Sequence, residues 1–406
     1  MHILYIHQYF ATPHGNTGTR SFEFAKRWVS AGHRVTMLTS TAQLTTNDLE
    51  SAEGQRVAKF TISGIDVVAL NVPYDQRMGF VRRTWAFSVF MFLACWNVLR
   101  IPKVDVIFAT STPLTIAVPA VVGHLLRRIP YVFEVRDLWP DVPVALGYVR
   151  NRVIIWMIKR LELMAYRFAD AIVALSPGVA QLIEKRLRHK IKIDIIPNCC
   201  DTELFSPDVD GTSIREAKGW SDSFVCMHTG AMGVVNGLDS ILNAAVHFRN
   251  EPAIRFVLIG GGKEKQRLRE EVDRRGLKNL DILDSVPKRT LVSYMAACDL
   301  ALMTVTSVPV LEHNSANKFF DYLSMGKPVV LNYSGWQREL LERIDAGCGC
   351  PMGDDDAFFS AIEALWNEPE TRARMSTNAR AAAENEFSRD RMAQRALESL
   401  MRVKKL

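Results

Sequence analysis

Apolar and polar residues follow one another along this chain as short strand-like runs separated by helical stretches. In the first half, continuously apolar runs such as 104–109 are typical of strands that are buried on both faces of a parallel sheet. The stretch 21–30 has helical periodicity, with Ser21 expected as its cap and Gly32 as its end. The strands predicted in this half are residues 2–6, 34–39, 66–70, 105–109, 131–135, 170–175 and 192–196.

The second half repeats the same alternation. Five strands are predicted at 224–229, 255–259, 280–283, 300–304 and 328–332, and four helices at 237–248, 263–275, 288–297 and 317–325. The fold class expected is therefore α/β, with two Rossmann-like, doubly wound domains. The boundary between them is expected in segment 197–222, which is rich in Pro, Asp, Ser, Thr and Gly and has no clear period. We place the domains at 1–200 and 201–385, and expect the amphipathic helix in 386–406 to pack back on the first domain.

One segment of the first half departs from this pattern. Residues 84–99 include no charged residue and five Trp or Phe residues, and they are flanked by Arg82, Arg83, Arg100 and Lys103. The segment is shorter than the roughly 20 residues that span a bilayer. Two interpretations remain open: a buried crossover helix, or a helix that lies in the lipid headgroup layer with its basic ends on anionic lipid.

Composition narrows the class of protein. The chain has 406 residues, 48% of them hydrophobic and 23% charged, and a net charge of +6. This mild excess fits an anionic substrate or membrane surface, whereas a nucleic-acid-binding protein would show a denser basic stripe. The seven cysteines lack zinc-site spacing, and Met1 leads directly into a strand, so we expect a reduced, cytosolic protein and no metal site. The acidic run 354–356 is interpreted as a helix N-terminus.

In paired α/β domains the ligand lies beyond the carboxyl ends of the strands. After the first strand, Gly15 and Gly18 allow a tight turn ahead of a helix, which suits a phosphate, although an ordinary loop explains them as well. After the strand at 131–135, Arg136 suits an anionic group, and Asp137 suits a sugar hydroxyl or a proton. A local ion pair between Arg136 and Asp137, with Asp141 nearby, remains the competing interpretation.

The second half offers three further candidates. Gly230 and Gly233 follow one strand, and Gly261 follows the next, with Lys265 at the start of the following helix. Further along the chain, Asn317 is a plausible helix cap, and Asp321 lies one turn inside, on the face that includes Lys318. A carboxylate there suits the two hydroxyls of a ribose, and the helix N-terminus suits a diphosphate. A solvated lysine face and a surface Lys–Asp pair are the structural alternatives.

Four segments together resemble the family-four retaining glycosyltransferases of the GT-B fold. They are His7-Gln8-Tyr9-Phe10 with Gly15, Gly18, Arg20 and 31–35; 196–205, with Cys199 where glycine is usual; 319–329; and 347–356. The resemblance covers nearly the whole chain. It is strongest to bacterial enzymes of O-antigen and capsule synthesis, of the N-acetyl-L-fucosamine transferase type.

The resemblance implies roles for individual residues. Asp321 would contact ribose, His313 stands where the first glutamate of a family pair falls, and Val286 would lie against the base. The basic residues that clamp the diphosphate would fall at Ala231 and Asn236, and both charges are missing there; Lys318, Lys265 and the Gly15 backbone are the expected substitutes, in that order. The catalytic set expected is Asp137, Arg136, Lys318 and His313, and the donor-binding set is Gly15, Gly18, Gly230, Gly233, Asn236, Gly261, Lys265, Val286, Asn314, Ser315, Asn317 and Asp321.

The function implied is front-face transfer of a sugar, with retention, from a UDP-sugar to a polyprenyl-diphosphate-linked saccharide. The sugar expected is an N-acetylated deoxyhexosamine, and the donor would bind in the cleft between the domains. The departing diphosphate would take the acceptor proton, so no cofactor and no metal are expected. Residues 80–103 would dock on an anionic membrane, on the inner face of the plasma membrane. The alternatives are a nucleotide-sugar 2-epimerase and a non-catalytic sugar-nucleotide-binding subunit; an NAD oxidoreductase is disfavoured because the first βα turn lacks GxGxxG.

Overall fold

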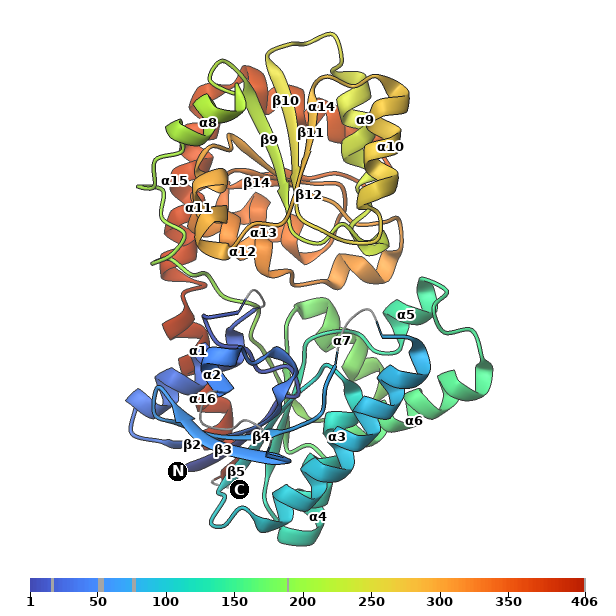
Figure 1. The fold of residues 1–406 in the computed structure, drawn as a ribbon, viewed down its shortest axis with the longest axis vertical. Coiled ribbons are helices and arrows are strands. Elements are labelled where there is room, and N and C mark those ends of the chain that lie inside the picture. Colours follow the sequence, from blue (N-terminus) through green and yellow to red (C-terminus); the bar gives the residue numbers. More distant parts are fainter. Residues whose placement is uncertain (16–17, 50–54, 75–77, 188–189, 405–406) are drawn as a thin grey trace. The chain divides into compact units, whose positions relative to one another are not determined.

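A computed structural model of the protein describes residues 1–15, 18–49, 55–74, 78–187 and 190–404, which form two α/β domains (Figure 1). The first domain comprises Met1–Pro197 together with Arg389–Leu406, and the second comprises Asn198–Ser388. The boundaries predicted from the sequence, after residues 200 and 385, each lie three residues from these.

The first domain is built on an eight-stranded sheet with the order β3-β4-β2-β1-β5-β6-β7-β8. All neighbouring strands are parallel except β3, which runs antiparallel to β4 at the edge. Sequence analysis missed β3, because its partly exposed side chains lack the continuous apolar character of the buried strands. The strands are β1 His2–Ile6, β2 Arg34–Ser40, β3 Val57–Ile62, β4 Ile65–Leu70, β5 Val106–Thr110, β6 Tyr131–Val135, β7 Ala171–Ala174 and β8 Lys192–Ile195.

Crossover handedness places the helices of this domain. The chain moves one way along the sheet from β1 to β2, and the other way from β4 through β5 and β6 to β7. Right-handed crossovers therefore put α1 on one side and α3, α4 and α6 on the opposite side, as Figure 1 shows. The helices are α1 Arg20–Ser30, α2 Thr46–Leu49, α3 Phe80–Arg100, α4 Ala117–Arg127, α5 Asp141–Ala145, α6 Arg152–Arg167 and α7 Pro177–Arg186, with 3-10 turns η1 Thr41–Gln43 and η2 Leu114–Ile116.

The last helix, α16 (Arg389–Lys404), belongs to the first domain and packs against α1. Its apolar side chains, among them Met392 and Leu400, are buried. The indole nitrogen of Trp28 on α1 donates to the carbonyl of Ala393 at 2.9 Å, and Arg389 pairs with Glu23. The chain thus returns to the domain in which it began.

The segment with no charged residue forms α3, and it matches neither sequence interpretation alone. Ala86, Phe90, Ala94 and Val98 recur every fourth residue and are buried, so one face is an ordinary crossover face. The opposite face is exposed. No helix among the described residues is long and apolar enough to span a membrane.

The second domain has a parallel six-stranded sheet with the order β11-β10-β9-β12-β13-β14. Its main core lies where α9, α10 and α14 cover one face, and a smaller cluster around Trp220 covers the other. The strands are β9 Phe224–Thr229, β10 Ile254–Ile259, β11 Leu280–Leu283, β12 Leu300–Met303, β13 Val329–Leu331 and β14 Gly347–Gly349. The helices are α8 Thr212–Lys218, α9 Asp239–His247, α10 Lys265–Arg275, α11 Lys288–Ala296, α12 Asn317–Ser324, α13 Trp336–Ile344, α14 Asp355–Asn367 and α15 Pro369–Asn385, with 3-10 turns η3 Val234–Asn236 and η4 Pro309–His313.

Two local expectations about the elements need correction, and two elements of the second domain were not predicted. Ser21 is not the cap of α1: Thr19 holds that position, and Ser21 lies inside the helix. Asn317 is not the cap of α12 but its first residue, after Ala316. The segment 197–222 includes a helix, α8, and the sheet of the second domain includes β14, whose Gly-Cys-Gly sequence gives no strand signal.

The interpretation of the acidic run 354–356 is confirmed. Asp354 caps α14, and its carboxylate accepts from the backbone nitrogen of Ala357 at 2.9 Å. A carboxylate at this end of a helix is stabilised by the orphan amides and by the helix dipole.

Candidate active site

The carboxyl ends of β9 and β10 approach each other closely in the second domain. A Cβ on Gly260 would lie 1.8 Å from the carbonyl oxygen of Gly230, and a Cβ on Gly262 would lie 2.2 Å from that of Met232. The backbone nitrogen of Met232 donates to Gly261 at 2.8 Å, which joins the two loops. Only glycine fits at 260 and 262, so these glycine clusters build a compact backbone edge where a ligand can approach.

Helix α12 lies against the end of β9 through two side chains one turn apart. The hydroxyl of Tyr322 accepts from the backbone nitrogen of Thr229 at 2.8 Å. Four residues earlier, Lys318 Nζ lies 2.9 Å from His228 Nε2 and 3.2 Å from the Asn236 side-chain oxygen. Because residues i and i+4 share one face of a helix, the contact that anchors Tyr322 also brings the Lys318 amine to the strand end.

Gly230 makes room for this lysine. A Cβ there would meet Lys318 Cε at 3.3 Å and Nζ at 3.4 Å, and Gly230 has φ +119°, a conformation that other residues rarely adopt. Gly230 therefore leaves room for the Lys318 side chain, in addition to lying against the backbone of Gly260.

The protonation of His228 follows from its two contacts. Nδ1 lies 3.1 Å from the carbonyl oxygen of Leu302, which can only accept, so Nδ1 is the protonated nitrogen. Nε2 is left as an acceptor, and Lys318 donates to it. Burial, together with the neighbouring Lys318, holds the pKa of His228 well below its usual range, which keeps the ring neutral. Burial also lowers the pKa of Lys318 to about 7.

The structure brings Lys318 and Asn236 together. Asn236 ends η3, its backbone nitrogen donates to Gly233 at 2.9 Å, and its own carbonyl accepts from the hydroxyl of Thr304 at 2.5 Å. The amide side chain of Asn236 thus stands beside a lysine that comes from a different element.

The second expected substitute, Lys265, is differently placed. Its Nζ donates to the carbonyls of Gly260 and Leu283, each at 2.8 Å, and to Asp284 at 2.5 Å. It therefore ties together the ends of β10 and β11. Val286 is partly buried, next to the cluster around Trp220.

The loop ahead of α12 is fixed by its own polar groups. The side-chain oxygen of Asn314 accepts from the backbone nitrogen of Ala316 at 3.3 Å, and its carbonyl accepts from the indole of Trp336 at 2.7 Å. Ser315 accepts two hydrogen bonds from Asn198. Partly buried His313 ends η4, Asn317 begins α12 at the surface, and Asp321 is partly buried one turn further on.

The first domain gathers a second polar group at the carboxyl ends of β1, β5 and β6. Buried His7 contacts the hydroxyl of Ser21 at 2.8 Å. Burial, with Arg136 nearby, holds the pKa of His7 well below its usual range. The backbone nitrogen of Arg136 donates to Ser111 at 3.0 Å, and Asp137 accepts from the hydroxyl of Thr112 at 2.7 Å.

The competing interpretation placed Asp141 near an ion pair between Arg136 and Asp137, but the carboxylate of Asp141 pairs with Arg186. In the loop after β1, the backbone nitrogen of Gly15 donates to Thr12 at 3.1 Å, and Gly18 is exposed. Residues 16 and 17 of that loop lie outside the described residues.

A buried ion pair lies beneath this edge. Arg20 donates to Glu134 through Nε at 3.0 Å and Nη2 at 2.9 Å, and the hydroxyl of Thr110 donates to the second carboxylate oxygen at 2.9 Å. Arg20 also donates to the carbonyls of Ile196 and Pro197. It therefore joins the sheet of the first domain to the last residues before the second.

Sequence reasoning gave no role to His228 or Tyr322. A signal for His228 was present: it is a polar residue inside the otherwise apolar, fully buried run of β9, directly before Thr229 and Gly230. A polar residue at such a position needs a buried partner. Its partner comes from α12, some 90 residues later, and no local pattern could name it.

Two parallel-sheet, Rossmann-like domains in one chain, each with polar side chains at the carboxyl edge of its sheet, define the GT-B architecture. Two family models match the chain: "Glycosyl transferase 4-like domain" over residues 15–199, and "Glycosyl transferases group 1" over residues 211–382. The chain belongs to the glycosyltransferases that these two models describe.

Curated relatives are similar at low identity. A probable glycosyltransferase, WbjE, of Pseudomonas aeruginosa is 21% identical over 270 residues, 66% of this chain and 67% of that protein. The O-antigen chain mannosyltransferase C of Escherichia coli is 25% identical over 266 residues, 62% of this chain and 67% of that protein.

A solved structure shares the whole fold. HepE of Anabaena, solved in complex with UDP and glucose, superposes with a TM-score of 0.72 at 20% identity, covering 99% of this chain and 100% of that one. At this identity the likeness shows the fold alone.

Proposed function

We propose that this glycosyltransferase moves a sugar from a UDP-sugar to a lipid-linked saccharide in the synthesis of a bacterial surface polysaccharide, with retention of anomeric configuration. The observation that supports it most is the position of Lys318. Its Nζ lies beside Asn236, at the glycine edge of the second domain, where the family resemblance expects a cation for the donor diphosphate and the sequence has none.

Lys318 would serve the leaving group. A cation at the diphosphate stabilises the negative charge that grows there as the glycosidic bond breaks. His228 accepts from one N–H of Lys318, and Asn236 from another, which leaves a third for a phosphate oxygen. The N-terminus of α12 adds partial positive charge beside it.

The remaining residues would bind the donor and the acceptor. We propose that Asp321 accepts the ribose hydroxyls and that Val286 lies against the base. Arg136 and Asp137, at the carboxyl edge of the first domain, would face the acceptor. In front-face transfer the diphosphate takes the acceptor proton, so the protein orients the acceptor and needs neither a nucleophile nor a metal.

Similar proteins and the exposed face of α3 support a saccharide acceptor that is linked to lipid. The mannosyltransferase C relative is named for an O-antigen chain, and HepE was solved with UDP. The exposed apolar face of α3 lies between basic residues, which suits an anionic membrane contacted through residues 80–103. We propose a peripheral protein of the inner face of the plasma membrane, and an N-acetylated deoxyhexosamine as the sugar.

A donor panel tests this proposal. Purified protein is mixed with UDP-, GDP- and dTDP-sugars, with and without a membrane extract that includes lipid-linked saccharides, and release of the nucleoside diphosphate is measured. We expect release from a UDP-sugar only when the extract is present. Isomerisation of a donor without extract would instead establish an epimerase, and donor binding without turnover would establish a binding subunit.

A further inference from the structure

Exposed apolar side chains are concentrated in one part of the chain. Thirteen large apolar residues are exposed among the described residues, and twelve of them lie between residues 81 and 168. The thirteenth, Val234, lies in the second domain. Single exposed apolar residues are normal, but a concentration of this kind marks a site of interaction.

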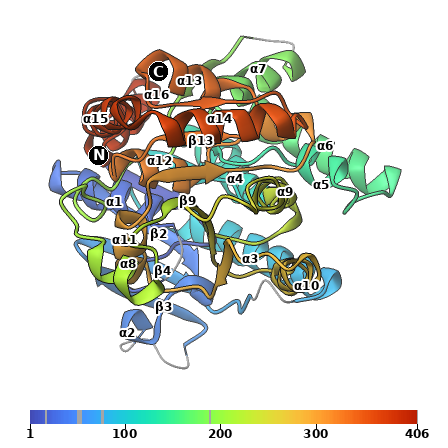
Figure 2. The same cartoon turned by 90° about the horizontal axis from the view of Figure 1, so that it is seen from above.

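These side chains lie on three helices of the same side of the sheet. Trp85, Phe92 and Trp96 lie on α3, Leu126 lies near the end of α4, and α6 has a set of its own. Helix α4 packs against both α3 and α6, so the three helices form one layer, the side opposite to α1 and α16 (Figure 1). Figure 2 shows α5 and α6 projecting at its edge.

The α6 set extends into the loop ahead of that helix. Trp156 and Met157 are each 58% exposed, Val153 is 65% exposed, and Tyr148 precedes the helix with 63% exposed. The opposite face of α6 is fixed to the domain, because buried Glu162 pairs with Arg186 of α7, and the carbonyl of Ala165 accepts from the hydroxyl of Tyr131 on β6 at 2.6 Å. The exposed face of α6 therefore belongs to a firmly anchored helix.

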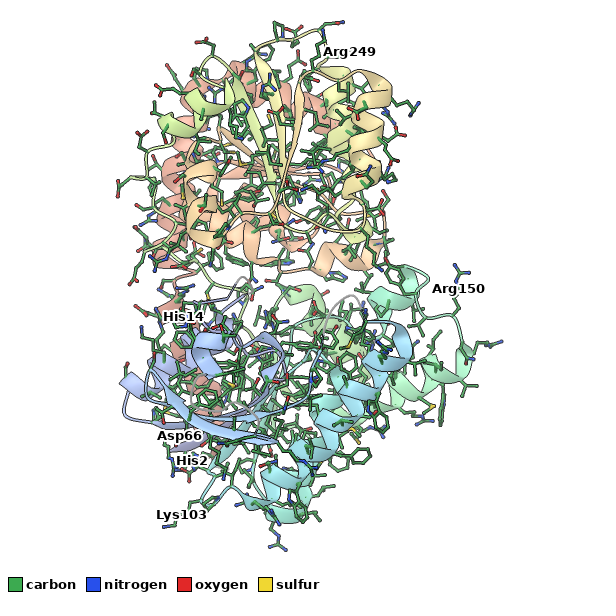
Figure 3. The ribbon with its side chains drawn as sticks, viewed as in Figure 1. His2, His14, Asp66, Lys103, Arg150 and Arg249 are labelled. Carbon is green, nitrogen blue, oxygen red and sulfur yellow. The ribbon has the colours of Figure 1, made fainter. Side chains whose placement is uncertain are left out.

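The exposed charges of this layer are basic. Helices α3, α4 and α6 together include eight Lys and Arg residues and a single acidic residue, the buried Glu162. Lys103 after α3 and Arg150 before α6 point away from the body of the first domain (Figure 3). In a chain whose acidic residues are nearly as many as its basic ones, such segments are strongly complementary to an anionic surface.

Helices α3 and α6 repeat one local arrangement. The guanidinium of Arg100 lies 3.8 Å from the ring centre of Trp96, and that of Arg160 lies 5.3 Å from the ring centre of Trp156. In both helices the arginine follows the tryptophan by four residues and shares its exposed face. A tryptophan beside a cation suits the boundary between acyl chains and headgroups, where one end of the side chain is apolar and the other is wet.

We infer that α6, with the loop ahead of it and the end of α4, is a second membrane-contacting surface beside α3, and that the three helices together bind an anionic lipid bilayer. This inference rests on the proposed function in one respect, which is that α3 already contacts the membrane. Insertion of two separated helices fixes the orientation of the domain on the bilayer, whereas a single helix would leave it free to rotate about one axis.

Paired variants test the α6 contact. Binding to vesicles of phosphatidylcholine with phosphatidylglycerol is measured by flotation for the wild type, for Trp156→Glu with Met157→Glu, and for Trp85→Glu with Phe92→Glu. Val234→Glu is the control, since among the described residues Val234 is the large exposed apolar residue that lies outside the layer. We expect each double variant to bind about tenfold more weakly and the control to bind as the wild type does. Vesicles of phosphatidylcholine alone should bind the wild type weakly.

A quenching measurement keeps the test independent of folding. Brominated acyl chains quench tryptophans that enter the bilayer, so replacing Trp156 by Phe should remove part of the lipid-dependent quenching while the affinity stays close to that of the wild type. Wild-type binding by the α6 double variant, or no loss of quenching in Trp156→Phe, would overturn the inference. A concentration-dependent dimer that the α6 variant abolishes, with no vesicle binding, would assign the surface to a second copy instead.

Failure here is distinct from failure of the proposed function. Transfer to an acceptor solubilised in detergent needs no bilayer, so it reports the chemistry alone. A chain that transfers in detergent and does not bind anionic vesicles would refute the membrane contacts of both α3 and α6 and keep the sugar transfer. A chain that binds vesicles through both helices and never transfers a sugar would support the membrane surface and refute the proposed transfer.

Discussion

The surroundings of the Lys318 amine lower its pKa. Its Nζ is placed among a neutral imidazole, an amide oxygen and the glycine edge of two strands, and burial lowers its pKa to about 7. An anionic ligand beside such an amine raises its pKa again, so the amine binds the ligand in its charged form. The contacts of its amine with His228 and Asn236 direct this lysine toward the end of β9.

Proton uptake on donor binding should follow from this pKa. Above pH 7 the free amine is mostly neutral, and a bound diphosphate raises its pKa, so binding at pH 8 should take up close to one proton. The affinity for UDP should accordingly weaken about tenfold between pH 7.5 and 8.5. Calorimetry in two buffers of different ionisation enthalpy measures the uptake, and Lys318→Arg, which stays charged, is the control. Equal uptake by the wild type and the Arg variant would rule out Lys318 as its source.

At the scale of elements, glycines decide how close two strand ends come. Gly260 and Gly276 both have positive φ, but only Gly260 would bring a Cβ against backbone, and nothing lies within 4 Å of a Cβ on Gly276. We expect Gly276→Ala to lower the free energy of unfolding by about 1 kcal/mol and Gly260→Ala to lower it by more than about 3 kcal/mol, because the strand ends must separate. Urea unfolding followed by circular dichroism compares the two, and equal losses would contradict the close approach.

The buried pair between Arg20 and Glu134 gives a second comparison among elements. Glu134→Gln leaves a buried guanidinium without its carboxylate, which should cost about 3–5 kcal/mol of unfolding free energy. The exposed pair Arg34–Asp66, joined at 2.9 Å between β2 and β4, is the matched control; Asp66→Asn should cost less than about 1 kcal/mol. Similar losses in the two variants would mean that the buried pair has no special part in joining α1 to β6.

A feature of the fold or of the candidate site could be predicted from the sequence where its cause lies in neighbouring residues. Continuous apolar runs located the buried parallel strands to within a residue or two, since burial on both faces leaves a mark in the sequence. The edge strand β3 and the three-residue strand β14 have no continuous apolar run in the sequence, so neither was predicted. Among the candidate site residues, the glycines after β9 and β10 were proposed from the sequence pattern, whereas the contact between Lys318 and His228 depends on how α12 packs on β9. The sequence of α3 includes the residues of both its buried and its exposed face, but only the helical register of the structure shows which residues belong to each face.

At the scale of the whole molecule, the chain begins and ends in the same domain. Removal of residues 389–406 should therefore damage the first domain and spare the second. Without α16, apolar side chains of α1 and of the sheet lose their cover, and Trp28 loses its acceptor on Ala393. Limited proteolysis with mass spectrometry should show cleavage within residues 1–197 and a protected fragment of 198–388. Protection of both parts would show that α16 is dispensable.

We propose that Lys318, in the second domain, supplies the charge for a sugar transfer from a nucleotide donor. Measuring kcat/KM for transfer from a UDP-sugar to a detergent-solubilised acceptor with the wild type, Lys318→Met and Lys318→Arg tests this role. We predict that the Met variant loses about 10²–10³-fold, that the Arg variant keeps most of the activity at high pH, and that the new linkage keeps the donor's anomeric configuration. Wild-type turnover by the Met variant would contradict the account.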